Sequence, residues 1–352
     1  MPTSDGPTAT ILLNIIKILV LCAVGIFLYI TLDMNKPFIK EVQVMTSKTR
    51  TMSPEQIRMH SLNEIFQQNS DILPNRTTNL SAKELCNKRS TCAPKGRRYE
   101  TMLRVAPKYK LLSCVIQKSM STMMSGTTCY LYDEEEYRKD ERSIEDEFHE
   151  RFCKDKNEFS SVEDARDAYN ISFINNDWSF SMVTRHPIDR FISGYVDRCI
   201  RIDQKNITGQ CNGCGLNITC FIQKEYKRVM DIANQRKTRR TMEDAHFFPQ
   251  IWHCDLDKEV DYFEYIQYSS DPEERLIPQL EEILVRQNVP SESIDFIKSE
   301  LTNKRSSHST VGTNARNFYY DRLINSPFLL EYIVKMFYYD FLQFHYELPE
   351  GF

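Results

Sequence analysis

Two short polar segments of the chain carry side chains that could bind an anion. Residues 117–122 (QKSMST) combine Lys118 with the hydroxyls of Ser119, Ser121 and Thr122, and they open a predicted helix. Backbone N–H groups at a helix start, together with a lysine and hydroxyls, favour binding of a phosphate or sulfate group. An ordinary helix cap would use the same residue types, and the Gly-x-x-x-x-Gly-Lys-Ser/Thr motif of nucleotide-binding loops is absent.

The second segment, residues 185–195 (RHPIDRFISGY), begins with an arginine at the end of an apolar run. The planar guanidinium of Arg185 can hold a phosphate through two hydrogen bonds. Pro187 suits the first turn of a helix, and Ser193 would add a hydroxyl about two turns later. Surface charge alone would also explain these residues, but open α/β sheets bind ligands where successive strands end. The two segments together therefore predict one anion-binding site.

Short apolar runs precede both segments and predict the strands that hold them. KLLSCVI (110–116) and FSMVTR (180–185) are short, apolar and followed by polar turns, as expected of buried strands. A helix should follow each strand, so the pattern indicates an α/β domain with a central parallel sheet flanked by helices. We expect this single domain at 107–352, after a polar stem at 33–106.

The N-terminal region predicts membrane attachment. Residues 11–32 are apolar apart from Lys17, and as a helix they would span about 33 Å, enough to cross a bilayer core. A cleaved signal peptide is the alternative, but residues 1–10 contain no Lys or Arg, and no small-x-small cleavage site follows. The sequence therefore predicts a short cytoplasmic tail at 1–10 and a transmembrane signal anchor at 11–32.

Features after the anchor predict the side of the membrane on which the domain lies. Lys36 and Lys40 would favour an external N-terminus. Two other features point the opposite way, to a domain in the lumen. The chain has five Asn-x-Ser/Thr sequons, and ten cysteines lie outside the anchor, an even number that suits disulfides in an oxidising lumen. We expect a type II protein with a lumenal domain. The sequons begin at Asn75, Asn79, Asn170, Asn206 and Asn217.

Composition excludes other classes of protein. The chain has 352 residues, of which 41% are hydrophobic and 27% charged, so it can build a core and is not a disordered polymer. Its 45 basic and 49 acidic residues give a formal net charge of −4. This balance argues against a protein that coats nucleic acid, and we expect no nucleic-acid partner.

A third motif, HFFPQ at 246–250 with Cys254 after it, completes a resemblance. The three segments resemble those of the Golgi carbohydrate sulfotransferases, in the branch of the chondroitin 4-O- and HNK-1-type enzymes. That family reads Arg-Asp/His-Pro-x-x-Arg-x-x-Ser-x-Tyr/Phe in the second segment, and 185–195 match every position. In the first segment it reads Pro-Lys-x-x-Cys/Ser-Ser/Thr-Asn, from which Gln117 and Met123 depart, as in a divergent invertebrate-type member. The resemblance covers about residues 107–350.

The resemblance implies a P-loop-like domain that uses 3′-phosphoadenosine 5′-phosphosulfate to sulfate a carbohydrate hydroxyl in the Golgi membrane. Lys118 would neutralise charge on the leaving group, and no metal is required. Arg185 and Ser193 would hold the 3′-phosphate of the donor. The 5′-phosphosulfate would be held by the loop amides with Lys118, Ser119, Ser121 and Thr122.

The acceptor hydroxyl needs a general base, and histidine has the most suitable pKa for that role. His246 is the first choice because it begins the family-like motif, and His308 and His253 are the reserves. The alternative for His246 is a structural histidine that caps the turn before Pro249.

A sulfate-accepting glycan is often anionic, so we expect a basic groove for the acceptor. A basic helix surface is an equal alternative for the residues concerned. The candidates are Lys224, Lys227, Arg228, Arg236, Lys237, Arg239 and Arg240.

Cys211 and Cys214, with Cys220 nearby, could suggest a zinc site. No fourth ligand stands at a recognisable spacing, and two sequons flank the segment. We therefore expect a surface insertion closed by disulfides.

Two other functions fit parts of the sequence. A catalytically inactive, membrane-anchored relative could bind glycans, although retention of Lys118, Arg185 and Ser193 argues against this. A P-loop kinase with lumenal substrates would need ATP and magnesium, and the missing glycine-rich loop argues against it.

Overall fold

The structure, a computed structural model, describes residues 59–87, 91–148, 151–172, 177–201, 210–236, 241–304 and 309–352. The predicted tail and anchor (1–32) lie outside these ranges, and so does the first part of the predicted stem. Within these ranges, none of the helices has both the length and the apolar character that a membrane span requires.

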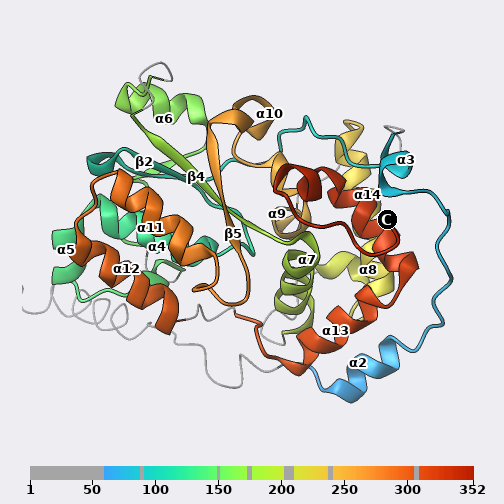
Figure 1. Cartoon of the computed structure of the whole chain (residues 1–352). Coiled ribbons are helices and arrows are strands. Elements are labelled where there is room, and N and C mark those ends of the chain that lie inside the picture. Colours follow the sequence, from blue (N-terminus) through green and yellow to red (C-terminus); the bar gives the residue numbers. More distant parts are fainter. Residues whose placement is uncertain are drawn as a thin grey trace, which may run out of the picture. The chain divides into compact units, whose positions relative to one another are not determined.

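The described strands form one mixed sheet in the order β3-β1-β2-β4-β5 (Figure 1). β4 pairs in parallel with β2 on one side and with β5 on the other, which places Phe180 beside both Leu112 and Phe263. β1 runs antiparallel to β2 and β3. The strands are β1 (Leu103–Ala106), β2 (Leu111–Cys114), β3 (Glu158–Phe159), β4 (Ser179–Arg185) and β5 (Phe263–Tyr268).

The prediction of a parallel sheet is confirmed for β2, β4 and β5 and is wrong for β1 and β3. Only the 3₁₀ turn Pro107–Tyr109 and Lys110 separate β1 from β2. A parallel crossover needs a dozen or more residues to return the chain to the same end of the sheet. The short connection therefore forces β1 to run antiparallel to β2.

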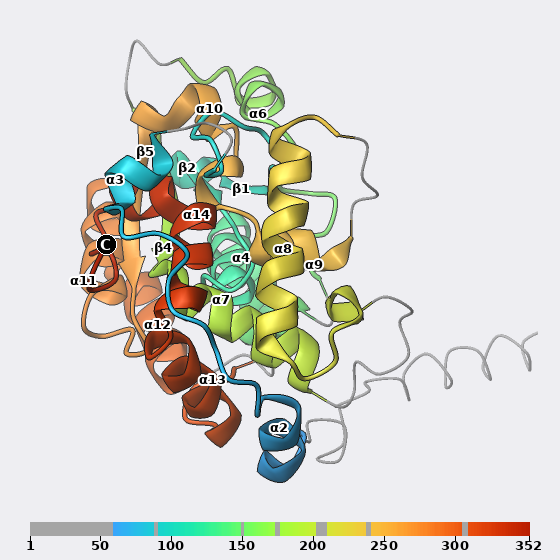
Figure 2. The ribbon, with the colours of Figure 1, turned by 90° about the vertical axis from the view of Figure 1, so that its right-hand side faces the viewer.

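Helices cover both faces of the sheet, as predicted for an α/β domain. All seven residues of β4 are buried, and its side chains alternate, so that Met182 and Val183 enter different apolar clusters. Helices α4, α11 and α12 pack with Val183. Helices α7, α8 and α14 pack with Met182, and α8 and α14 lie side by side (Figure 2).

Most of the helices are short, and several begin at a residue whose side chain caps the first turn, such as Ser161 for α6 and Ser326 for α14. Their bounds are α2 (Leu62–Gln68), α3 (Ala82–Cys86), α4 (Ser121–Tyr132), α5 (Glu134–Lys139), α6 (Val162–Tyr169), α7 (Pro187–Tyr195), α8 (Ile218–Ala233), α9 (Met242–Phe247), α10 (Leu256–Glu259), α11 (Leu276–Arg286), α12 (Ser291–Asn303), α13 (Asn314–Ile324) and α14 (Pro327–Gln343).

Part of the segment predicted as a stem belongs to the folded unit. Ile65 of α2 and Leu103 of β1 are fully buried in the larger apolar cluster. The Cys86–Cys92 disulfide closes a small loop and packs against Val334 of α14. The folded unit therefore includes residues from Met59 onward, ahead of the predicted boundary at 107.

Ten cysteines form five disulfides. Two of these pair Cys199 with Cys211 and Cys214 with Cys220, so Cys211 and Cys214 have no thiolate to offer a zinc ion. The prediction of a disulfide-closed insertion is confirmed. The other pairs are Cys86–Cys92, Cys114–Cys254 and Cys129–Cys153.

Candidate active site

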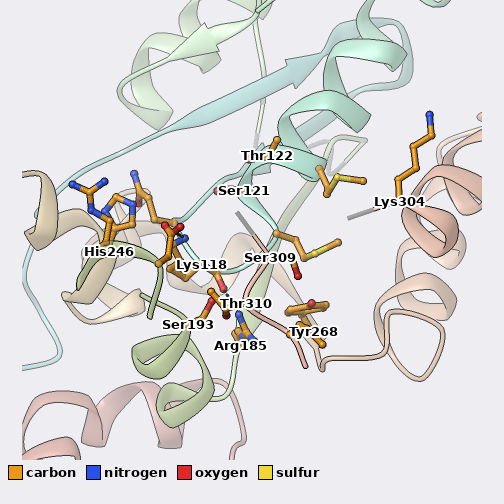
Figure 3. A pocket seen from close by; sticks show the side chains of 16 residues that line it. Lys118, Ser121, Thr122, Arg185, Ser193, His246, Tyr268, Lys304, Ser309 and Thr310 are labelled. Atoms are coloured by element: carbon orange, nitrogen blue, oxygen red, sulfur yellow. Dashed lines mark hydrogen bonds and ion pairs between the residues drawn. The ribbon is translucent and has the colours of Figure 1, made fainter. Parts of the chain in front are cut away.

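The two predicted anion-binding segments meet at the carboxyl edge of the parallel strands, around a pocket of about 290 Å³ (Figure 3). The loop after β2 and helix α7 after β4 supply its opposite walls, and α9 contributes a third. This is the position at which open α/β sheets bind ligands. Six of the seven predicted site residues line the pocket: Lys118, Ser121, Thr122, Arg185, Ser193 and His246.

The loop between β2 and α4 has a backbone suited to an anion. Lys118 (φ 68°) and Met120 (φ 60°) have positive φ angles, which are uncommon for non-glycine residues. No side chain of the described residues caps the start of α4. The N–H groups of its first turn therefore remain available to a ligand at the end of the pocket where Ser121 and Thr122 lie.

Arg185 is a buried cation that faces the pocket. It is 5% exposed, and its Nη1 donates to the carbonyl of Lys118 at 3.0 Å. The guanidinium lies over the ring of Tyr268, 5.1 Å from the ring centre. Burial lowers the pKa of Arg185, and no carboxylate in the described part of the chain forms an ion pair with it. A buried charge without an acidic partner is costly, so this position favours an anionic ligand.

Gln250 of the third motif fixes the backbone of Arg185. Its Oε1 accepts from the N–H of Arg185 at 3.0 Å, and its Nε2 donates to the carbonyl of the same residue at 2.8 Å. The backbone N–H groups of Gln250 and Ile251 donate to the buried carboxylate of Asp340, at 2.8 and 3.0 Å. Burial raises the pKa of Asp340 to about 6. The HFFPQ segment thus supports the end of β4.

Arg190 of the second motif ties the three segments together. It is buried, and it donates to the carbonyls of Gln117 (3.0 Å), Phe248 (2.8 Å) and Ala245 (3.3 Å). Close packing reinforces this link, because a Cβ atom on Gly194 of α7 would lie 2.9 Å from the ring of Phe247. A glycine at this position lets α9, and His246 with it, approach the pocket.

Lys118 forms an ion pair inside the site. Its Nζ lies 2.5 Å from Oδ2 of Asp197, and Oδ1 of Asp197 lies 3.1 Å from Nη1 of Arg201. Burial lowers the pKa of Lys118, while Asp197 opposes that shift. The lysine expected to neutralise negative charge is therefore held in place by a buried carboxylate.

Comparison with known proteins identifies the family to which this site belongs. The profile of the sulfotransferase family matches residues 101–347. The chain belongs to the sulfotransferase family. A Caenorhabditis elegans protein named "Putative sulfotransferase vep-2" is 60% identical over 314 residues, which are 89% of this chain and 98% of that relative. No solved structure matches the chain significantly.

Two more distant nematode relatives extend the comparison. An uncharacterised C. elegans protein is 43% identical over 296 residues, 83% of this chain and 82% of its own. "Carbohydrate sulfotransferase chst-1" from the same organism is 32% identical over 247 residues, 69% of this chain and 74% of that relative. The resemblance seen in the three sequence motifs is confirmed at the level of the family.

Ser119 is the predicted site residue of this sulfotransferase that does not line the pocket. Its side chain is 1% exposed, and its hydroxyl donates to Oε1 of Gln250 at 3.3 Å. The left-handed residues on either side turn Ser119 away from the pocket and toward the HFFPQ segment. Its side chain supports the loop, and it does not reach the surface where a donor would lie.

The three candidate bases fall into different places. His246 is half-buried on α9 and lines the pocket. His253 is 1% exposed and lies beside the ring of Tyr99, and burial and the nearby Arg190 lower its pKa. His308 lies outside the described residues. Of the two described candidates, His246 is the one that a substrate in this pocket could reach.

The basic residues predicted to bind the acceptor are mostly paired with acids. Arg228 forms an ion pair with Asp244, and Asp231 is paired with both Lys227 and Arg236. Lys224 donates to the carbonyl of Asn212, and 237–240 lie outside the described ranges. The cations that line the pocket itself are different ones, namely Lys118, Arg185, Arg198 and Lys304. Of these, Arg198 is also paired with Glu243 and Lys304 with Glu300.

Sequence reasoning missed several residues of the pocket wall, among them Asp197, Tyr268 and Lys304. Asp197 follows Ser193 by four residues, a helical spacing that would have placed both on one face. Tyr268 ends β5, a strand with no predicted role, so its sequence carried no signal. Lys304 follows α12, and only the tertiary fold brings it to the pocket.

Proposed function

We propose that this sulfotransferase transfers a sulfuryl group from 3′-phosphoadenosine 5′-phosphosulfate to a hydroxyl group of a carbohydrate. The observation that carries the proposal is the convergence on one pocket of Lys118, His246 and the buried Arg185, which has no acidic partner in the ranges that the structure describes. The name of the relative chst-1 supports a carbohydrate acceptor.

The residues of the pocket fit the charge of the proposed donor. Two anionic groups, a phosphosulfate and a 3′-phosphate, need two separate cationic positions. The described lining residues include four cations (Lys118, Arg185, Arg198 and Lys304) and one carboxylate, Asp197, which pairs with Lys118. Arg198 and Lys304 pair with Glu243 and Glu300, and Arg185 has no acidic partner among the described residues. Phosphate and sulfate groups are well bound by such side chains together with helix N–H groups.

When bound, the donor supplies an activated sulfuryl group, and the chain supplies position and charge. The first turn of α4, with the hydroxyls of Ser121 and Thr122, would hold the phosphosulfate, and Lys118 would neutralise charge that develops there. Arg185 and Ser193 would hold the 3′-phosphate. His246 would accept the proton of the acceptor hydroxyl at a ring nitrogen. Arg198 and Lys304 also line the pocket, each paired with a glutamate, and would offer their remaining N–H groups to an anionic glycan.

The proposal includes a Golgi location, with residues 11–32 as a type II anchor and the folded unit in the lumen. The five disulfides support an oxidising compartment.

Calorimetry on the full-length protein in detergent tests the donor site. We expect 3′-phosphoadenosine 5′-phosphate to bind with micromolar affinity and ATP to bind much more weakly. Arg185→Ala should weaken nucleotide binding by at least about 100-fold, because a charge-assisted contact is lost from a buried site. The matched control is Arg286→Ala, since Arg286 is paired with Glu264 at the opposite edge of the sheet.

Transfer is then measured with radiolabelled donor and a panel of chondroitin, heparan and neutral glycans. Labelled anionic glycan is the expected result. Binding without transfer to any glycan would favour the inactive, glycan-binding alternative, and failure of wild type to bind the nucleotide would refute the donor site.

A further inference from the structure

Asp197 links the two donor-binding segments of the site. It lies in the π-helical turn Val196–Ile200 that continues α7, four residues after Ser193. Both side chains line the pocket. Single π-helical turns occur frequently at functional sites, where they re-aim a side chain. The helix that presents Ser193 therefore also presents a carboxylate to the lysine of the other segment.

The carboxylate of Asp197 is held from two sides. Its Oδ2 contacts Nζ of Lys118 at 2.5 Å, and its Oδ1 contacts Nη1 of Arg201 at 3.1 Å. The side chains of Asp197, Lys118 and Arg201 are 4%, 10% and 1% exposed. Arg201 is not among the residues that line the pocket, and it contacts the other carboxylate oxygen, so it fixes Asp197 without displacing Lys118.

Asp197 is the one acidic residue among the described residues that line the pocket around Lys118. Arg185 from β4 and Arg198 from the π-helical turn both lower the pKa of Lys118, as burial does, and Asp197 opposes them. His246 of α9 also lines the pocket. Without the carboxylate, the lysine would be buried among cations and would lose its proton at a lower pH.

We propose that Asp197 is a positioning residue for sulfuryl transfer, which fixes the charged Lys118 side chain in the pocket where the donor's phosphosulfate group is to be neutralised. This inference rests on the proposed function. An ammonium group has three donors, so Lys118 can keep its bond to Asp197 and still offer N–H groups to a ligand. A purely structural ion pair would not need its lysine to line the pocket.

The pH dependence of Asp197→Asn tests the proposal. The substitution keeps the shape of the side chain and removes its charge. For wild type, we expect transfer and nucleotide affinity to change little between pH 7 and 8.5. For the variant, both should fall as pH rises over this range, with the alkaline limb displaced by at least about one pH unit and kcat at pH 8 reduced at least about tenfold.

Two variants control for a general loss of structure. Asp197→Glu keeps the charge, so it should restore the wild-type position of the alkaline limb even if kcat stays lower. Asp189→Asn removes a carboxylate from the same helix that pairs with Arg316 outside the pocket, and it should leave the limb unmoved. If Asp197→Asn folds poorly, the pH dependence of nucleotide affinity is measured in Asp197→Ser, which also removes the charge and should show the same fall as pH rises.

An alkaline limb that stays in place in Asp197→Asn, or a loss of activity that is equal at every pH, would overturn the proposal. If wild type binds 3′-phosphoadenosine 5′-phosphate without transferring sulfate, the proposed function fails. The pH dependence of nucleotide binding would still test the role of Asp197, so the two failures are distinguishable.

Discussion

Both ends of the parallel strands open into hollows, and the two hollows differ in how their charges are balanced. At the amino ends, a hollow of about 880 Å³ is lined by three cations and three carboxylates. Its cations are exposed and paired, as Lys110 is with Asp177 and Arg286 with Glu264. At the carboxyl ends, the pocket of about 290 Å³ is lined by four cations and one carboxylate. Three of these cations are paired, Lys118 with Asp197, Arg198 with Glu243 and Lys304 with Glu300, whereas Arg185 has no acidic partner among the described residues.

This comparison shows that the size of a hollow does not identify the site. Exposed ion pairs contribute little and can form wherever long charged side chains meet. A buried cation without an acidic partner costs free energy, so a fold retains it where an anion is to bind. Within the described part of the chain, Arg185 meets that criterion, whereas Lys108, Lys110 and Arg286 at the amino edge are exposed and paired.

The largest difference between the two edges should appear in sulfate transfer. Lys118→Ala removes the buried lysine of the pocket, and we expect transfer to fall by about 10²–10³-fold, as for other groups that stabilise transition-state charge. Lys110→Ala removes an exposed lysine at the amino edge and should change transfer less than about twofold. The measurement is kcat/KM with radiolabelled donor. Comparable losses in the two variants would break the comparison.

Arg190 tests whether burial of a cation is enough to mark an anion site, because it is a buried cation that faces backbone carbonyls and not the pocket. Arg190→Met removes three hydrogen bonds and should lower the free energy of unfolding by about 2–4 kcal/mol. Urea denaturation with the disulfides intact gives this value. Arg185→Ala should lower it by less, while weakening nucleotide binding more. The reverse order would mean that burial alone, without orientation, explains both arginines.

Glu225 tests whether burial of an acidic group that has no cationic partner among the described residues also costs free energy. It is fully buried in α8, it accepts one hydrogen bond from Asn212, and burial raises its pKa to about 8. The folded protein therefore favours the protonated form of Glu225. The contribution of this protonation to the free energy of unfolding is fully present below about pH 4 and is lost as pH rises through about 8.

Glu225→Gln should thus be about 1–3 kcal/mol more stable than wild type at pH 7, with a flatter dependence of stability on pH. Thermal melts between pH 5 and 8 measure the difference. A variant whose stability falls in parallel with wild type would show that Glu225 is ionised in the fold.

The smallest effect is expected from a sequon near the amino edge. Asn170 is exposed at the end of α6, next to Tyr169, whose ring contacts Trp178 of the hollow. In protein from a secretory host, Asn170→Gln should remove one glycan by mass and change nucleotide affinity less than about twofold.

Asn217 provides the contrast. Its Nδ2 donates to the carbonyl of Gln68 and its Oδ1 caps α8, so we expect it to carry no glycan. The prediction would be contradicted if Asn217 carried a glycan or if none of the exposed sequons carried one.

The sequence predicted the parts of the fold that depend on local signals. The strand that ends at Arg185 and the helix that begins at Pro187 are found where expected, because an apolar run and a helix-starting proline are read from adjacent residues. β1 was missed because LRVA is short and lies in a segment of polar composition. Its place in the sheet depends on pairing with β2, which no local pattern encodes.

The sequence predicted which residues belong to the site, but it did not predict how their side chains are arranged within it. The side chain of Ser119 points away from the pocket because Lys118 and Met120 on either side of it have positive φ angles. The residue types Lys and Met do not predict such angles. Asp197 acquires its role through a lysine 79 positions earlier in the chain. Spacing along the chain identified which segments carry chemistry, but contacts across the fold decide which atoms of those segments face the pocket.

The Cys114–Cys254 disulfide has a consequence for making the protein. It joins the end of β2, just before the Lys118 loop, to the segment after Gln250, across 140 residues of sequence. Cross-linking so long a loop removes about 5 kcal/mol of entropy from the unfolded chain in the simplest treatment. Oxidation is therefore a step in building the pocket. A bacterial cytosol would yield chains in which the two halves of the site are not joined, so recombinant production should use a host with an oxidising secretory pathway.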